Sequence, residues 1–516
     1  KKGNTSDDGI YAGYVPSKLT VKNAQKHPAN LVESSAMAAV SAPTITYTPH
    51  IDQNIIDKGL ISDVQLENIS YAGQAHEEVL ESGERRGYFI GDGTGVGKGR
   101  QAAGIILDNF NQGRKKALWI SEKAALMEDA KRDWRDIGGN PDDIFNIDGI
   151  RKGIGKGKDK VIPSDGILFT AYSTVRAGKT KDSKTTNADR IIEWLGKDFD
   201  GVIIYDEAHN MNTLLAKDSK NGSQQAIEAN KIQEKLPNAR VVYMSATGAV
   251  EVKDLCFASR LGLWGKGTQF TSAEDFVEKI GASGVAGMEL VASSLKAMGA
   301  YQARSISYDG VKYDSIKHTL TKNQRVMYDT FCEAWQITLQ NMEKAISSTK
   351  VKNAGTARSL YYSAMQNFYN QVLSSMAMPS VIEDINKEIA NGHSCVIQLI
   401  NTNEAQQNRE LAKVKAEGND LDDLDITPRG ALLGFLENSF PVQQYEEYID
   451  EHGNIQSRPV FDSAGNPVLN KQAVAARNAL VERVKEMSIP EGPIDMIINA
   501  FGADKVAEVT GRSRRI

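Results

Sequence analysis

The run GYFIGDGTGVGKGR, at residues 87–100, is the most informative stretch of the chain. A short apolar segment leads into a loop dense in glycine, and the following residues, QAAGIILDNF, are typical of a helix. Gly93, Gly95 and Gly97 allow the backbone to curl so that its N–H groups converge on a phosphate, and the helix N-terminus adds partial positive charge. Lys98 then comes within reach of the β- and γ-phosphates of a nucleotide. The run therefore predicts a phosphate-binding loop between a strand and a helix.

Two positions of this loop depart from the usual pattern GxxxxGK[ST]. Asp92 stands in place of the first glycine, and Gly99 stands in place of the hydroxyl residue after the lysine. That hydroxyl normally binds Mg²⁺, so another oxygen or a water must take its place. The loop residues expected to contact the nucleotide are Asp92, Gly93, Thr94, Gly95, Val96, Gly97, Lys98, Gly99 and Arg100.

A second feature, GVIIYDEAHN at residues 201–210, is an apolar run that ends in two carboxylates. Asp206 is placed to hold Mg²⁺ through water, and Glu207 to polarise the water that attacks a γ-phosphate. A third feature, RVVYMSAT at 240–247, is another apolar run, ending in Ser-Ala-Thr. We expect Lys98, Asp206 and Glu207 to carry the chemistry.

Five short apolar runs rich in β-branched and aromatic residues predict strands, with helical patterns between most of them. They are residues 87–90, 116–121, 166–172, 201–206 and 240–246. This alternation predicts an α/β fold with a parallel sheet covered on both faces. Because parallel strands end at one edge of a sheet, the three features are expected to form one site.

Length and composition exclude several classes of protein. The 516 residues suggest about three structural units. With 61 Lys+Arg against 66 Asp+Glu the net charge is −5, which excludes a polybasic coat but not a basic groove on an acidic body. The 3 cysteines lie far apart, which argues against a disulfide scaffold or zinc ribbon and favours a reducing, intracellular compartment. The sequence contains no run of 18 apolar residues, so it predicts no membrane-spanning helix.

The order of phosphate loop, DEAH and SAT is that of superfamily 2 helicases and translocases, and further runs narrow the resemblance. The chain resembles the strawberry notch family in GDGTGVGKGRQAAGII at 91–106, YVPSKL at 14–19, HPANLVESS at 27–35, SDVQLENISYAGQAHE at 62–77, VVYMSATGA at 241–249 and VAEVTGRSRR at 506–515. The similarity extends from Tyr14 to Arg515, and glycine at position 99 is typical of that family.

The resemblance implies an ATPase of two RecA-like lobes that uses ATP and Mg²⁺ and acts on nucleic acid. It implies that Gln65 senses adenine, with Gln74 as the alternative. It implies that His209, Ser245 and Thr247 couple the nucleotide site to the nucleic acid. The residues expected by the same resemblance to contact nucleic acid are Ser121, Thr170, Tyr172, Asn401 and Thr402.

Four segments are expected from these patterns. They are an N-terminal extended arm at 1–62, a RecA-like first lobe at 63–268, a mainly helical insertion or linker at 269–375, and the start of a second RecA-like lobe at 376–516 with an acidic excursion at 417–470. The second lobe is expected to be incomplete, because no QxxGRxxR run supplies the arginine fingers of motif VI.

The resulting hypothesis is an ATP-dependent helicase or translocase, with DNA favoured over RNA and no membrane. The resemblance extends to bacterial and phage members of the DarB antirestriction type, so a methyltransferase domain fused to or associated with the chain is a further expectation. A bacterial cytoplasm or phage delivery fits such a member, and a nucleus fits a eukaryotic one. The alternative is a nucleic-acid clamp, scaffold or co-regulator with a vestigial ATPase; intact Lys98, Asp206 and Glu207 argue against it.

Overall fold

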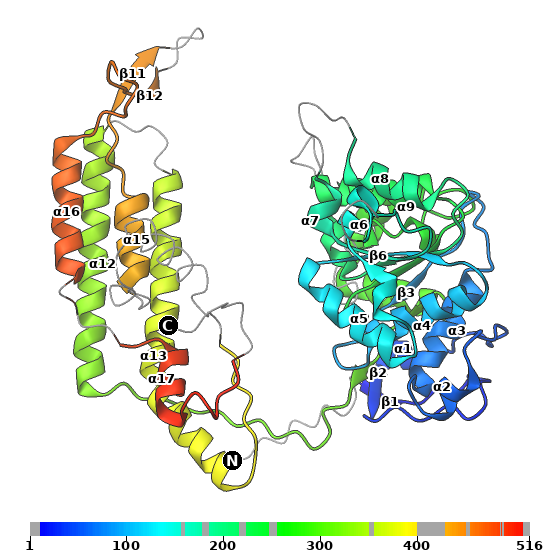
Figure 1. Ribbon diagram of the computed structural model, residues 1–516. Coiled ribbons are helices and arrows are strands. Elements are labelled where there is room, and N and C mark those ends of the chain that lie inside the picture. The colour runs from blue at the N-terminus through cyan, green and yellow to red at the C-terminus, as the bar shows by residue number, and fades with distance from the viewer. Residues whose placement is uncertain are drawn as a thin grey trace. The chain divides into compact units, whose positions relative to one another are not determined.

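A computed structural model describes most of the chain (Figure 1). The described residues are 11–155, 160–177, 185–215, 223–246, 255–349, 355–399, 429–449, 455–485, 487 and 490–508. The chain divides into two compact units, Lys1–Val311 and Lys312–Ile516. None of the helices in these ranges is long and apolar enough to cross a membrane.

The first unit is built on a seven-stranded sheet with the strand order β5-β6-β4-β7-β8-β3-β9. Every pairing in this sheet is parallel. The strands are β3 (Tyr88–Ile90), β4 (Lys116–Ser121), β5 (Ile144–Phe145), β6 (Gly166–Ala171), β7 (Val202–Tyr205), β8 (Arg240–Met244) and β9 (Tyr301–Gln302). The predicted α/β class and the five predicted strands are therefore confirmed.

Helices cover both faces of this sheet, because successive strand residues point to opposite sides. Ala117 and Trp119 of β4 pack in a core with α3 (Asp63–Ala75), α4 (Lys98–Asn111) and α5 (Met127–Asp136). Leu118 and Ile120 pack in the core of the other face. Figure 1 shows α4 and α5 on one side of the sheet and α8 and α9 on the other. The helices of this second face are α6 (Ile147–Lys152), α7 (Tyr172–Val175), α8 (Asn187–Leu195), α9 (Gln224–Lys235), α10 (Ala273–Gly281) and α11 (Gly284–Ala297).

The N-terminal residues pack on the first unit. Strands β1 (Tyr11–Tyr14), β2 (Leu31–Ser34) and β10 (Ser305–Ile306) form a small antiparallel sheet. Helices α1 (Ser35–Ala38) and α2 (Gln53–Asp57) follow β2. Ile45, Ile51, Ile56 and Ile61 are buried in the core that also holds α3 and α4. This segment is thus part of the unit that carries the phosphate loop. Four 3₁₀ segments complete the described elements of the unit: η1 (Ala124–Leu126), η2 (Pro141–Asp143), η3 (Ala208–Leu215) and η5 (Ser259–Leu261).

The second unit is mainly helical in its described residues. Its helices are α12 (Lys322–Thr349), α13 (Gly355–Ala390), α15 (Arg429–Asn438), α16 (Lys471–Lys485) and α17 (Pro493–Phe501), and its strands β11 (Tyr445–Ile449) and β12 (Ile455–Pro459) form an antiparallel hairpin. The ring of Trp335 lies 5.3 Å from that of Tyr361 and 5.6 Å from that of Phe368, centroid to centroid. These aromatic side chains therefore form the core of the unit.

The apolar run SCVIQLI at 394–400 lies in the segment expected to start the second lobe and has the composition of a strand. Its described residues, 394–399, form no strand, and Val396 is 99% exposed. An isolated strand has no partner for its backbone groups, and the only strands described after residue 376 are β11 and β12, which pair with each other. Helix α13 runs through residue 375 without a break. The second lobe and the segment boundaries given above stay predictions.

Candidate nucleotide-binding site

The loop between β3 and α4 has the backbone that a phosphate loop requires. Gly95 and Gly97 have φ of 90° and 91°, a left-handed region that residues with a Cβ adopt rarely. Gly97 is the N-cap of α4, so the helix N-terminus faces the loop. The Nζ of Lys98 donates to the backbone oxygen of Asp92 at 3.0 Å and closes the loop on itself. The predicted strand, loop and helix are therefore present, with the lysine at the loop.

Asp92 anchors this loop instead of facing a ligand. Its side chain is fully buried, and its carboxylate accepts five hydrogen bonds. Arg304 donates three of them, from its backbone N at 3.0 Å, from Nε at 3.0 Å and from one terminal nitrogen at 2.7 Å. Asn68 and Gln101 donate the other two, at 3.0 and 2.9 Å. Asp92, the acid in place of the first glycine, thus ties the start of the loop to Arg304, which follows strand β9.

Arg304 is a residue that the sequence analysis missed. It is buried, and its guanidinium also donates to Glu67 at 3.0 Å, whose carboxylate accepts from the hydroxyl of Tyr14 at 2.5 Å. Burial lowers the pKa of Arg304, but the charge of Asp92 and its hydrogen bonds outweigh burial, so the net shift is upward. The arginine stays charged and joins the N-terminal segment, α3 and the loop.

Gln65 lies against the loop, but its amide is already hydrogen-bonded at both ends. Its Oε1 accepts from the backbone N of Ser62 at 2.9 Å in a capping box, and its Nε2 donates to the oxygen of Val96 at 3.0 Å. The alternative, Gln74, bonds to Thr46 and Thr44 of the N-terminal segment instead of the loop. Adenine recognition by Gln65 stays a prediction, and it would require this amide to change partners.

The other loop residues differ in exposure. Thr94 and Gly95 are exposed, and Val96 is buried beside Leu31 and Val64. The guanidinium of Arg100 bonds to the oxygen of Leu60 at 2.7 Å and to Asp136 at 2.8 Å. The side chain of Arg100 is therefore engaged away from the loop.

Asp206 and Glu207 follow the end of β7, at the same edge of the sheet as the loop. Burial raises the pKa of Asp206, and the charge of Glu207 adds to this, while the hydrogen bond from Ser121 and the charge of Lys98 oppose it. The hydroxyl of Ser121, at the end of the neighbouring strand β4, donates to Oδ2 of Asp206 at 2.8 Å. Glu207 has φ of 46°, a strained backbone of the kind that clusters at functional sites.

His209 and Ser245 meet beside these carboxylates. The Nδ1 of His209 lies 3.2 Å from the hydroxyl of Ser245 and 3.4 Å from a carboxylate oxygen of Glu207. The backbone N of Ser245 donates to the oxygen of Ile90, at the end of β3, at 3.2 Å. Thr247 lies outside the described residues. The three sequence features thus come together in space, and the coupling role stays a prediction.

The residues predicted to touch nucleic acid are not on the surface where they are described. Ser121, Thr170 and Tyr172 are 0%, 3% and 1% exposed. The hydroxyl of Ser121, predicted to contact the polymer, donates instead to the carboxylate of Asp206. Asn401 and Thr402 lie outside the described residues.

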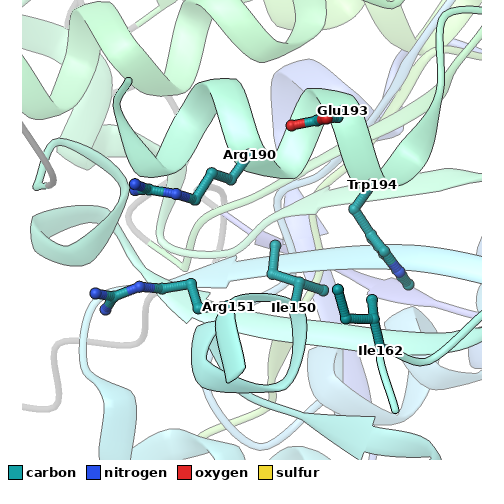
Figure 2. A pocket seen from close by; sticks show the side chains of 6 residues that line it. All are labelled: Ile150, Arg151, Ile162, Arg190, Glu193 and Trp194. Atoms are coloured by element: carbon teal, nitrogen blue, oxygen red, sulfur yellow. The ribbon is translucent and has the colours of Figure 1, made fainter. Parts of the chain in front are cut away.

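A cavity of about 510 Å³ lies between α6 and α8 (Figure 2). It is lined by Ile150, Arg151, Ile162, Arg190, Glu193 and Trp194. Figure 2 shows the two arginines extending to one side and Trp194 and Ile162 lying at the other. None of the lining residues belongs to the loop or to the DEAH and SAT runs.

Comparison with known proteins agrees with this geometry. The family described as "P-loop containing NTP hydrolase pore-1" matches residues 26–330. The human protein strawberry notch homolog 1 is 36% identical over 435 residues, covering 84% of this chain and 31% of that protein. Protein strawberry notch of Drosophila melanogaster is 36% identical (84% and 26% coverage), and protein FORGETTER 1 of Arabidopsis thaliana is 33% identical (87% and 35%).

The chain spans between about a quarter and about a third of the length of these relatives. A solved SWI2/SNF2 ATPase core of Sulfolobus solfataricus in complex with dsDNA is 13% identical, with a TM-score of 0.32 over 69% of this chain and 64% of that chain, too distant for residues to be equated. The family match covers more than half of the chain and includes the loop, both carboxylates and Ser245. The chain therefore belongs to the strawberry notch family of P-loop NTP hydrolases.

Proposed function

We propose that the chain binds Mg²⁺–ATP at residues 91–99, hydrolyses it, and uses the reaction to move on nucleic acid. One observation carries the proposal: contacts join the three features at one sheet edge. Ser245 bonds to the end of β3 through its backbone and to His209 through its hydroxyl, and His209 lies beside Glu207. Ligands of parallel α/β sheets bind at this edge.

Each residue has a role that its surroundings support. The ammonium of Lys98 now bonds to a backbone oxygen of its own loop, a neutral partner that phosphate oxygens can replace. Glu207 is half-buried, and the contact given for its carboxylate in the described part of the chain is an ion pair with His209 at 3.4 Å, so the carboxylate keeps capacity to orient a water. Asp206, fixed by Ser121, is the carboxylate that would hold Mg²⁺. When bound, Mg²⁺ would neutralise charge on the phosphates.

The protein oxygens would supply only part of a metal shell. In the described part of the chain, no group of three or more His, Cys, Asp or Glu side chains is arranged to hold a metal. Magnesium usually keeps several waters and takes one or two carboxylates plus substrate phosphates, which fits a site with Asp206 at its centre. The residues present therefore fit Mg²⁺ that arrives with the nucleotide.

Action on nucleic acid, and on DNA in particular, rests on the family resemblance and on the position of His209 and Ser245. His209 links Glu207 to Ser245, which directly follows β8, so a change at the γ-phosphate would reach the end of that strand. Movement would follow from nucleotide-dependent shifts between two arrangements of the protein. Contacts to the polymer would be mainly to phosphates, so binding should weaken as salt rises. The antirestriction role and the methyltransferase partner rest on the resemblance alone.

The competing function is a clamp or scaffold with a vestigial ATPase. It predicts nucleic-acid binding without turnover. The Asp206 carboxylate favours an active site, because burial raises its pKa and so makes its charged form costly at neutral pH, as is common at functional sites.

The test is ATP hydrolysis by the chain with and without single- and double-stranded DNA. We expect Glu207→Gln to lower turnover by a factor of about 10² or more, as loss of a positioned base does. Glu77→Gln, at an exposed carboxylate two residues beyond the end of α3, is the matched control and should leave turnover unchanged. Hydrolysis in wild type that neither DNA nor Glu207→Gln alters would contradict the proposal. Binding of DNA without any hydrolysis would establish the clamp instead.

A further inference from the structure

Position 99 is glycine for a reason that the structure makes visible. A Cβ placed on Gly99 would lie 2.2 Å from Oδ2 and 3.4 Å from Cγ of Asp133. The first distance is far inside the contact limit of any real Cβ. A serine or threonine at 99 and the present position of Asp133 therefore exclude each other. A carboxylate oxygen occupies the space from which the usual hydroxyl would project.

Asp133 lies on α5, and its carboxylate is weakly partnered. Its side chain is only 16% exposed. Its ion pairs, with Arg132 at 3.6 Å and Arg100 at 3.8 Å, are both longer than a hydrogen bond. Among the described residues, no hydrogen bond ends on this carboxylate. Arg100 instead makes its close contact, 2.8 Å, with Asp136 of the same helix. The oxygens of Asp133 thus retain their capacity for another partner.

The surroundings of Asp133 favour the binding of a cation by its carboxylate. Burial raises the pKa of Asp133, and the charges of Arg132 and Arg100 oppose this shift. A half-desolvated carboxylate gains from a cation more than an exposed one does, because screening by water is reduced. A hard, small cation with oxygen ligands is the natural partner.

The usual hydroxyl also lies beside the carboxylate of the DEAH-type strand, and in this chain another residue takes that position. In phosphate-loop proteins the hydroxyl after the lysine binds the metal beside the carboxylate of the DEAH-type strand. Here the hydroxyl next to that carboxylate belongs to Ser121, which donates to Asp206 at 2.8 Å. Because residue 99 is glycine, no hydroxyl projects from that position, and an oxygen of Asp133 lies there instead.

We propose that Asp133 replaces the missing side chain at position 99 and supplies the loop-side oxygen for the Mg²⁺ of the bound nucleotide, directly or through a metal-bound water. This inference rests on the proposed function, since it assumes that the loop binds Mg²⁺–ATP. It has a distinctive consequence. A carboxylate, unlike a hydroxyl, repels a metal-free polyphosphate, so nucleotide binding should depend on Mg²⁺ more steeply than with a neutral ligand.

The experiment is a Mg²⁺ titration of the affinity for a fluorescent ATP analogue, measured by anisotropy on the full chain, with EDTA as the metal-free baseline. Asp133→Asn keeps the shape and removes the charge. We expect the gain in affinity on adding Mg²⁺ to fall roughly tenfold or more, since loss of such an oxygen costs 10- to 100-fold in metal affinity. We expect affinity in EDTA to be unchanged or higher.

Asp136→Asn is the matched control, because it removes the closer partner of Arg100 from the same helix. If Asp133 served only as a partner for arginines, Asp136→Asn would lower nucleotide affinity more than Asp133→Asn does. The gain in affinity on adding Mg²⁺ would then be the same for Asp133→Asn as for wild type. That result would overturn the inference.

A swap tests the shared space independently. Gly99→Ser alone should weaken Mg²⁺-dependent binding, because the new side chain collides with Asp133. Gly99→Ser combined with Asp133→Ala should recover at least part of it; no recovery would contradict the replacement. Lys98→Ala separates the two proposals. If wild type binds no nucleotide, or Lys98→Ala binds as well as wild type, the proposed function fails and this inference with it. Loss in Lys98→Ala with an unchanged Asp133→Asn refutes this inference alone.

Discussion

Replacing Arg304 with glutamine should destabilise the first unit severely. The guanidinium donates three side-chain hydrogen bonds, two to Asp92 and one to Glu67, and all three side chains are at most 2% exposed. Removing it leaves two carboxylates buried without their cation. Breaking a buried pair in this way costs about 3–5 kcal/mol. In a unit of this size each kcal/mol lowers Tm by about 2 °C, so we expect a fall of roughly 6–10 °C.

The assay is thermal unfolding followed by tryptophan fluorescence and circular dichroism, with nucleotide affinity measured in parallel below the transition. Lys279→Gln is the control. Lys279 forms a 2.7 Å ion pair with Asp275, but its side chain is 59% exposed, so this pair lies at the surface. Such a pair is worth at most about 1 kcal/mol, so Tm should fall by no more than about 2 °C. Arg304→Lys should recover only part of the loss, since an ammonium cannot bond both carboxylates in the same geometry. A fall for Arg304→Gln as small as that of the control would refute the reasoning.

Two further predictions concern pH. Folding raises the pKa of Asp206 above its ordinary value of 3.8, so ionisation of this carboxylate lowers the stability of the folded protein as pH rises. Asp206→Asn should therefore be more stable than wild type near pH 7 and lose this advantage near pH 3, as measured by denaturant titration. Equal stability of the two proteins at pH 7 would contradict the prediction. Burial lowers the pKa of His76 from 6.5 to about 3, so the unfolded chain binds a proton that the folded one does not, and stability should fall by about 2 kcal/mol between pH 6.5 and pH 5. His76→Gln, followed over the same range, should lose that part of the slope, and an unaltered slope would exclude His76 as its source.

The sequence predicts correctly those features that depend on a few neighbouring residues. The phosphate loop, the carboxylates after β7 and the five main strands follow from short apolar runs and their ends, and the structure has each of them. The strands β5 and β9, of two residues each, are too short to leave a pattern. The run at 394–400 has the composition of a strand but finds no partner in the described residues.

The supporting contacts could not be found this way, because they join distant positions. Arg304 meets Asp92 across 212 residues, and nothing near either residue signals the other. Ser121 reaches Asp206 only because β4 and β7 are neighbours in the sheet, which the order of the chain does not state. Gln65 did carry a local signal, since Ser62 three residues before it makes the capping box that occupies its amide.

The structure of the chain with Mg²⁺ and a slowly hydrolysed ATP analogue tests the central claim most directly. We predict the β- and γ-phosphates on the loop at 93–98, the ammonium of Lys98 turned from the oxygen of Asp92 to the phosphates, and the metal between the phosphates and Asp206. The network of Arg304 around Asp92 should be unchanged, since it only anchors the loop. Phosphates bound elsewhere, or Lys98 still bonded to Asp92 beside an occupied loop, would contradict the account.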